Sequence, residues 1–270
     1  MGEKNVALVT GVSSGIGRAT AELLSERGFR VFGTMRRPGE TDSRNVELVQ
    51  LDVRDEESVA TCVRTVLDRA SRIDALVNNA GYALIGSLEE TSTEEAKELF
   101  ETNFFGVLRM NRAVLSIMRE QRQGRIAIIG SVAGFVPMPY QGIYAATKHA
   151  LEGYSESLDH EVRQFGIRVS VIEPGFTRTA MAQNAQIAGQ TLAAYATGRR
   201  HVIDAVQQST TQGEDPVRVA SVVLEALTSR SPRLHYPAGY RARLISGLRK
   251  FVPTRLFDKV LRRQFGLEAG

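Results

Sequence analysis

Short apolar segments alternate with helical patterns along most of this 270-residue chain, and this alternation limits its fold more than any other feature. Most of the short segments are apolar throughout, which is typical of strands covered on both faces. Such strands form parallel sheets with helices packed on each side. The predicted strands cover residues 5–10, 29–35, 46–53, 74–78, 125–129, 167–172 and 233–236, and the predicted helices cover residues 18–27, 56–70, 93–122, 144–165 and 216–229.

The domain organisation follows from the same pattern. No linker or internal repeat interrupts the alternation, so the sequence predicts a single α/β domain with a doubly wound parallel sheet. We place it at residues 1–238, and a basic, amphipathic C-terminal helical extension of the same domain at residues 239–270. Residues 180–215 contain few large apolar groups and form either a substrate lid or a surface insertion. Loops above the carboxyl edge of a sheet often close active sites, which favours the lid.

Cysteine, histidine and hydropathy limit the class of protein further. The single cysteine, Cys62, excludes an intramolecular disulfide framework and fits a reducing compartment. The four histidines show no ligand spacing, so we expect no metal site. No apolar run approaches the roughly 18 residues of a membrane span, and the N-terminus lacks the features of a signal peptide. We therefore expect a cytoplasmic protein.

A glycine-rich segment lies between the first predicted strand and the first predicted helix. Its glycines permit a tight turn, close approach of the backbone to a pyrophosphate, and close packing of helix on strand. The helix N-terminus offers N–H donors and a positive partial charge to phosphate. A purely structural turn is the alternative, but the flanking strand and helix favour a Rossmann-type dinucleotide site. Its candidate contacts are Gly11, Ser13, Ser14, Gly15, Ile16 and Gly17.

The end of the second predicted strand bears on the choice of dinucleotide. An acidic residue about 20 positions after the glycine loop would bind the ribose hydroxyls of NAD(H). Arg36 and Arg37 stand there instead, and guanidinium groups suit the 2′-phosphate of NADP(H). The alternative is that both arginines are solvated turn residues. We therefore expect NADP(H) as the preferred cofactor and keep NAD(H) as the alternative.

Several motifs, in their order over about residues 5–180, resemble those of the short-chain dehydrogenase/reductase family. The glycine loop matches TGxxxGIG, residues 78–81 match NNAG, and residues 144–148 match YxxxK. The resemblance implies that the catalytic residues are Asn103, Ser131, Tyr144 and Lys148. It also implies cofactor contacts from Asp52, Val53, Asn79, Ala80, Gly81, Tyr144, Lys148, Pro174, Gly175, Thr177 and Thr179.

The chemistry of these residues supports acid–base catalysis. Tyr144 and Lys148 are four positions apart in a predicted helix and share a face. A free phenol has a pKa of about 10, and a nearby ammonium lowers it. Ser131 can hydrogen-bond the substrate oxygen, and by the resemblance Asn103 holds a water that links Lys148 to solvent. Alone, Tyr144 and Lys148 would form an ordinary surface pair, but Ser131 and the glycine loop favour proton transfer by Tyr144 alongside hydride transfer by the nicotinamide.

The C-terminal extension bears on substrate and partners. Its length resembles the hydroxysteroid and retinol dehydrogenase-like branch of the family. Nine lysines and arginines lie between Arg233 and Arg263 against one acid, Asp258. The C-terminal helices either pack on the body over the substrate cleft, which we favour, or touch an anionic membrane as a peripheral contact. Two apolar helical faces lie among the basic residues, Leu244, Ile245, Leu248 and Phe251, then Leu256, Phe257, Val260 and Leu261.

We therefore expect an NADP(H)-dependent oxidoreductase that interconverts a small hydrophobic secondary alcohol and its ketone, or an alcohol and an aldehyde. By the resemblance, it forms a homodimer through the helices predicted at residues 93–122 and 144–165. One alternative is a dinucleotide-sensing regulatory protein, although such proteins tend to lose the Tyr or the Lys. Another is a nucleic-acid binder, but no nucleic-acid-binding motif accompanies the basic tail, so we expect no nucleic-acid partner.

Overall fold

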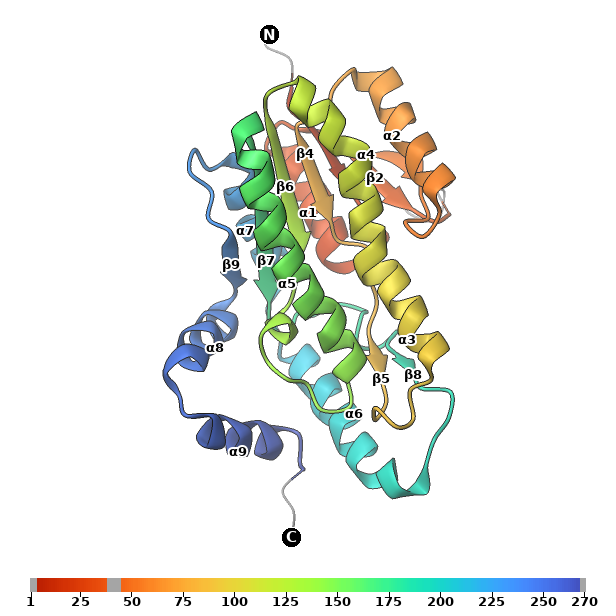
Figure 1. Ribbon diagram of the computed structural model, residues 1–270, viewed down its shortest axis with the longest axis vertical. Helices are drawn as coiled ribbons and strands as arrows, with labels where there is room; N and C mark the ends of the chain where they lie inside the picture. Colours follow the sequence, from red (N-terminus) through yellow and green to blue (C-terminus); the bar gives the residue numbers. More distant parts are fainter. Residues whose placement is uncertain (1–3, 38–44, 268–270) are drawn as a thin grey trace.

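The computed structural model describes residues 4–37 and 45–267 (Figure 1). Residues 1–3 of the predicted domain and residues 268–270 of the predicted C-terminal extension therefore lie outside the described residues. Its main sheet has seven strands in the order β3-β2-β1-β4-β6-β7-β9, with every neighbouring pair parallel. This confirms the doubly wound parallel sheet. A second, small sheet pairs β5 with β8. The strands are β1 (Val6–Val9), β2 (Arg30–Met35), β3 (Glu47–Gln50), β4 (Ala75–Asn78), β5 (Leu84–Ile85), β6 (Gly124–Ile129), β7 (Ile167–Pro174), β8 (Gln186–Ile187) and β9 (His235–Ala238).

Helices cover both faces of the main sheet. Helices α1 and α7 pack against each other on one face, while α2, α4 and α5 cover the other (Figure 1). The helices are α1 (Gly15–Glu26), α2 (Glu56–Ala70), α3 (Thr93–Phe100), α4 (Gly106–Glu120), α5 (Gly142–Val162), α6 (Ala196–Thr211), α7 (Pro216–Thr228), α8 (Tyr240–Phe251) and α9 (Thr254–Gln264).

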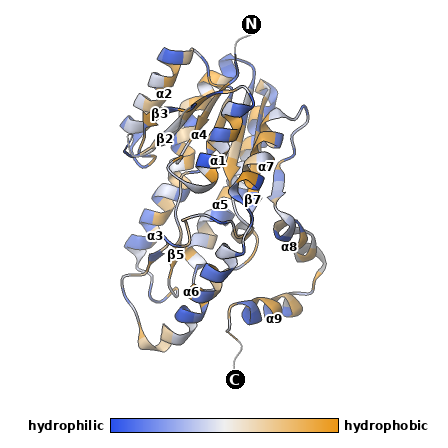
Figure 2. Ribbon diagram, turned by 180° about the vertical axis from the view of Figure 1, so that it is seen from behind, coloured by the Kyte–Doolittle hydropathy of each residue, from blue (hydrophilic) through white to orange (hydrophobic). Residues whose placement is uncertain are grey.

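Strand β1 shows why the strands are apolar throughout. Val6 and Leu8 belong to the core cluster formed with α2, α4 and α5, whereas Ala7 and Val9 belong to the cluster formed with α1 and α7. All four side chains are buried. Because successive side chains of a strand point to opposite faces, a strand covered on both sides has no polar face. The central strands are accordingly coloured as hydrophobic in Figure 2.

Several elements differ from the sequence-based expectation, among them the unpredicted strands β5 and β8 and the shorter strand β3. The helix predicted at residues 93–122 is α3 and α4 joined by a π-helical turn, Glu101–Phe105. The last strand begins two residues later than predicted, at His235, because its ladder with β7 starts at the pair Val171 and His235. Helix α6 occupies much of the segment expected to be a lid or an insertion, since the two buried residues Val202 and Val206 suffice to anchor it.

The residues of the two apolar faces predicted for the C-terminal helices differ in burial. Leu261, with Phe265 just beyond α9, is buried in a third core cluster that also contains Val202 and Val206 of α6. The carbonyl oxygen of Gly266 lies 3.0 Å from Nδ1 of His201, which is also on α6. These contacts pack the end of the chain on the body.

Of the other residues in these two faces, Ile245 and Phe257 are partly buried against the same cluster, whereas four leucine and valine side chains remain exposed. Leu244 and Leu248 on α8 and Leu256 and Val260 on α9 are between 44% and 59% exposed. The side chain of Phe251, which the sequence places on the same face, lies outside the described part of the chain. Within residues 4–37 and 45–267, no helix has both the length and the apolar character needed to cross a membrane.

Candidate active site

A cleft of about 540 Å³ opens where the carboxyl ends of β1, β4, β6 and β7 meet. In a parallel sheet this edge is where ligands bind. Gly17, Arg37 and Asn103 do not line the cleft. The predicted residues that line it are Gly11, Ser13, Ser14, Gly15, Ile16, Arg36, Asp52, Val53, Asn79, Ala80, Gly81, Ser131, Tyr144, Lys148, Pro174, Gly175, Thr177 and Thr179.

The glycine loop has a backbone conformation that favours glycine. Gly11 and Gly15 lie in the left-handed region, with φ of 71° and 61°. A Cβ on Gly17 would lie 2.2 Å from the carbonyl oxygen of Gly11, so this position has no room for any side chain. Ser14 precedes α1 without a side-chain cap, which leaves the first amides of the helix available to an anion. The loop therefore fits the pyrophosphate of a dinucleotide.

The segment after β4 braces this loop. Oγ1 of Thr10 accepts hydrogen bonds from the amides of Asn79 at 2.9 Å and Ala80 at 3.0 Å. Nδ2 of Asn79 donates to the carbonyl oxygens of Thr10 and Gly11, each at 2.9 Å. The amide side chain of Asn79 is thus committed to holding the loop. Thr10 is the first residue of the TGxxxGIG motif but is not among the contacts predicted from the sequence.

Three charged side chains meet at the far end of the cleft. Arg54 binds Asp52 at 2.6 Å, and this contact, supported by the charge of Arg36, lowers the pKa of Asp52 to about 2. Arg36 follows β2 and lines the cleft, whereas its exposed neighbour Arg37 does not. Arg54 also lines the cleft, and the sequence analysis missed it because it belongs to no motif. This end of the cleft is therefore suited to a negatively charged group.

Ser131, Tyr144 and Lys148 lie together in the middle of the cleft. Nζ of Lys148 donates to the carbonyl oxygen of Ile129 at 2.8 Å and lies 5.8 Å from the centroid of the Tyr144 ring. Burial raises the pKa of Tyr144, and a hydrogen bond with Ser131 opposes that rise. Burial lowers the pKa of Lys148 to about 8, against the opposing charge of Glu152. Two groups that usually titrate near or above 10 are thus held in one apolar environment.

Asn103 lies buried in the π-helical turn between α3 and α4. Its side chain exchanges two hydrogen bonds with the backbone of Tyr82, both at 3.0 Å, and donates to Oγ1 of Thr147 at 3.3 Å. The side chain therefore connects the segment after β4 to α5 next to Lys148. π-helical turns occur frequently at functional sites. The water predicted to bind at Asn103 stays a prediction.

The remaining lining of the cleft includes polar side chains such as Gln141 and Asn184 and a group of apolar side chains, the apolar wall. Met138, Phe176, Met181 and Val206 form this wall. Tyr140 does not line the cleft and packs edge-on against Tyr195, with ring centroids 6.2 Å apart. The open end of the cleft therefore suits an apolar substrate.

Three contacts join the segment before α6 and the first turn of α6 to the region around the start of α3. Hydroxyl oxygen of Tyr195 donates to Glu89 at 2.6 Å, the amide of Gly189 donates to Glu95 at 2.7 Å, and Arg199 pairs with buried Glu90. The segment and α6 together cover one side of the cleft through residues such as Met181 and Val206. Its movement as a lid stays a prediction.

His235 lies among acidic side chains, although the sequence gives it no ligand spacing. Potential ligand atoms of Glu152, Glu173 and His235 all lie within 4.8 Å of one another. The three residues come from α5, β7 and β9, so only the folded chain brings them together.

Cys62 is buried in α2, where burial raises the pKa of its thiol to about 12.

Comparison with known proteins identifies the family. The family model described as short chain dehydrogenase matches residues 5–189. A 3-ketodihydrosphingosine reductase from Bacteroides thetaiotaomicron is 34% identical over 264 residues, which are 96% of this chain and 97% of that protein. Human retinol dehydrogenase 8 is 40% identical over 181 residues, 62% of this chain and 57% of that protein. The chain therefore belongs to the short-chain dehydrogenase/reductase family and is an oxidoreductase, and its similarity to a retinol dehydrogenase agrees with the branch that the sequence resembles.

Solved structures agree with this assignment. A short-chain dehydrogenase from Streptomyces avermitilis matches with a TM-score of 0.83 and 37% identity, over 96% of this chain and 97% of that one. A Burkholderia phymatum family member in complex with NAD gives 0.80 and 25%, over 96% and 95%. A serine dehydrogenase complexed with NADP⁺ gives 0.73 and 28%, over 86% and 93%. The fold therefore binds NAD(P), and similar structures hold either form.

Proposed function

We propose that this protein is an NADP(H)-dependent oxidoreductase that interconverts a hydrophobic secondary alcohol and its ketone, or an alcohol and an aldehyde. The observation that carries the proposal is a shared cleft: the glycine loop, the buried pair Tyr144 and Lys148, and an apolar wall all open onto it. The nicotinamide dinucleotide, when bound, exchanges the hydride. The loop between Gly11 and Gly17 and the amides at the start of α1 would hold its pyrophosphate.

Tyr144 is the proposed acid and base. It gives a proton to the substrate oxygen in reduction and takes one back in oxidation. Since burial alone raises the pKa of Tyr144, the phenolate needs a positive charge close by, which Lys148 supplies. Ser131, whose Oγ accepts from the amide of Ala133 at 3.1 Å, positions the substrate oxygen beside Tyr144. Asn103 is proposed to complete the set by binding a water behind Lys148.

The apolar wall supports a long hydrophobic substrate. Two relatives are named for such molecules, one for the ketone 3-ketodihydrosphingosine and one for the alcohol retinol. Met138, Phe176 and Met181 would contact the hydrocarbon part, and burial of each methylene there contributes about 0.8 kcal/mol. We also propose the homodimer that is usual in this family.

Arg36→Leu is expected to weaken NADPH binding about tenfold and to change NADH binding less than about twofold. The reason is that Arg36 lines the adenosine end of the cleft, where the 2′-phosphate of NADPH adds a charge that NADH lacks. Fluorescence titration of each dinucleotide measures both affinities. Arg37→Leu is the matched control, because Arg37 is exposed and does not line the cleft. Equal losses for NADPH and NADH would contradict the proposed preference.

The exposed apolar residues of α8 and α9 support a peripheral contact with an anionic membrane. Leu244, Leu248, Leu256 and Val260 are exposed, and exposed basic residues such as Arg255 lie among them. Basic helices with one exposed apolar face bind anionic lipid surfaces. Such a contact would bring the protein to lipid-soluble substrates. Removing the extension is a poor test, because Leu261 and Phe265 belong to the core.

The double substitution Leu248→Asp with Val260→Asp is expected to reduce binding to phosphatidylglycerol vesicles at least about tenfold. It replaces two exposed side chains, so melting temperature and turnover of a water-soluble ketone should stay near those of the wild type. Vesicle cosedimentation measures the binding. Val217→Asp, at a 53% exposed position on α7, is the control. Absence of vesicle binding by the unsubstituted protein would rule the contact out.

A further inference from the structure

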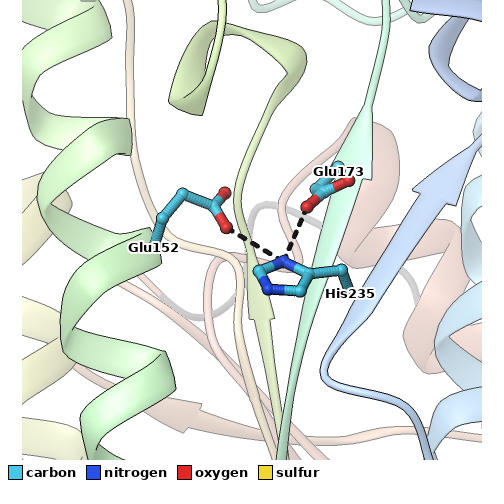
Figure 3. Close-up of side chains that lie close together, drawn as sticks. All are labelled: Glu152, Glu173 and His235. Atoms are coloured by element: carbon cyan, nitrogen blue, oxygen red, sulfur yellow. Dashed lines mark hydrogen bonds and ion pairs between the residues drawn. The ribbon is translucent and has the colours of Figure 1, made fainter. Parts of the chain in front are cut away.

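A cluster of charged side chains joins α5, β7 and β9, and Figure 3 shows its three central members, Glu152, Glu173 and His235. Nδ1 of His235 lies 2.9 Å from Oε1 of Glu173 and 3.3 Å from Oε2 of Glu152. Its other nitrogen, Nε2, lies 3.3 Å from the carboxylate of Glu156. The imidazole therefore has a carboxylate at each ring nitrogen, an arrangement that favours the doubly protonated form. The two glutamates at Nδ1 raise the pKa of His235 to about 10.

The two inner carboxylates are buried and incompletely paired. Oε1 of Glu152 and Oε2 of Glu173 have no hydrogen-bond partner among the described residues. Burial raises the pKa of Glu152, and the neighbouring charge of Glu173 raises it further, whereas the hydrogen bond with His235 lowers it. The charge of Glu152 thus depends on the cation beside it, because removing that cation would leave two carboxylates facing each other.

Glu152 borders both parts of the proposed catalytic group. It follows Lys148 by one turn on the same face of α5. A Cβ on Gly130 would lie 3.1 Å from Oε1 of Glu152, and a Cβ on Gly134 only 2.6 Å from it. These two glycines flank the segment that carries Ser131, so Glu152 packs against that segment at its backbone.

We propose that Glu152, held by His235, which also pairs with Glu173, is a positioning residue that keeps Lys148 protonated and thereby extends the pH range in which Tyr144 exchanges protons. The proposal rests on the proposed function of the same site. Glu152 acts on Lys148 through its charge, and it touches neither substrate nor cofactor in this account.

The groups that titrate around Lys148 set the direction of the effect. They are Tyr144 and Glu152 on α5, followed outward by Glu156 on α5, Glu173 on β7 and His235 on β9. Burial already lowers the pKa of Lys148 to about 8, and the negative charge of Glu152 opposes this. Without that charge Lys148 would lose its proton at lower pH, and the phenolate of Tyr144 would lose its stabilising partner.

Glu152→Gln is therefore expected to move the alkaline limb of the kcat/KM profile for ketone reduction to lower pH, by roughly one unit. Glutamine has nearly the same shape and fills the same space beside Gly130 and Gly134. Glu156→Gln is the matched control: it removes a carboxylate of the same helix and the same histidine, at a 53% exposed position on the outer side of the cluster. Its limb should stay within about 0.2 units of the wild type.

His235→Gln provides a second test that leaves α5 unchanged and serves if Glu152→Gln does not fold. Loss of the cation raises the pKa of Glu152, so its charge is reduced and the alkaline limb should again move to lower pH. A merely structural role for the cluster would lower the melting temperature and leave the limb in place. Unshifted limbs in both variants would overturn the proposal, whereas an inactive wild type would instead overturn the proposed function.

Discussion

Tyr144→Phe is expected to lower kcat by about 10²- to 10⁴-fold and to leave NADPH affinity within about threefold of the wild type. Phenylalanine keeps the ring that packs in the cleft, where Tyr144 is 9% exposed, and removes only the hydroxyl that exchanges the proton. Lys148 keeps its hydrogen bond to the carbonyl oxygen of Ile129 and remains in this variant as a positive charge beside the ring. Steady-state kinetics and a fluorescence titration measure the two quantities.

Tyr154→Phe is the matched control for this substitution. Tyr154 lies on the same helix, and its hydroxyl accepts a hydrogen bond from Asn111 at 3.1 Å, away from the cleft. It should retain wild-type kcat, although loss of the hydrogen bond costs about 1 kcal/mol of stability. Wild-type turnover by Tyr144→Phe would show that another group transfers the proton.

Gly17→Ala is expected to weaken the binding of both NADPH and NADH by about 10- to 100-fold. Its Cβ would lie 2.2 Å from the carbonyl oxygen of Gly11 and 2.4 Å from Nδ2 of Asn79. The first atom is backbone and the second is held by two hydrogen bonds, so the methyl group can be accommodated only if the loop opens. An opened loop no longer presents its amides to a pyrophosphate.

Gly247→Ala is the control, because a Cβ at this position of α8 meets nothing within 4 Å. It should leave both affinities unchanged and raise helix stability slightly, by up to about 1 kcal/mol. Fluorescence titration and thermal denaturation report on the two variants together. Wild-type affinity in Gly17→Ala would mean that the dinucleotide does not bind at this loop.

The fold could be predicted where the sequence pattern reflects burial. A strand such as β1 has no polar face, because both sides are covered, and this indicates a parallel sheet. The π-helical turn at Asn103 could not be predicted, because a single wider turn within a long helix does not change the types of residue from which the helix is predicted. The two-residue strands β5 and β8 are too short for any periodicity. Helix α6 was missed because its buried side is as narrow as Val202 and Val206.

The candidate site divides in the same way. Residues that belong to the glycine motif or to the YxxxK motif, such as Gly17 and Lys148, could be predicted from the sequence alone. Arg54 could not, because its relevance comes from the ion pair with Asp52 at the end of the cleft. The cluster around His235 depends on the pairing of β7 with β9 beside α5, which sequence spacing does not express.

One measurement decides whether the cleft is an NADP(H)-dependent active site. NADPH is mixed with the purified protein and 3-ketodihydrosphingosine in micelles, and the absorbance of the reduced nicotinamide is followed. Other long-chain ketones and aldehydes are tested in parallel. We predict that NADPH is consumed by the wild-type protein only when a carbonyl compound is present, and that Tyr144→Phe does not consume it. Tight binding of NADPH without consumption across the whole panel would contradict this function and favour a dinucleotide-sensing protein.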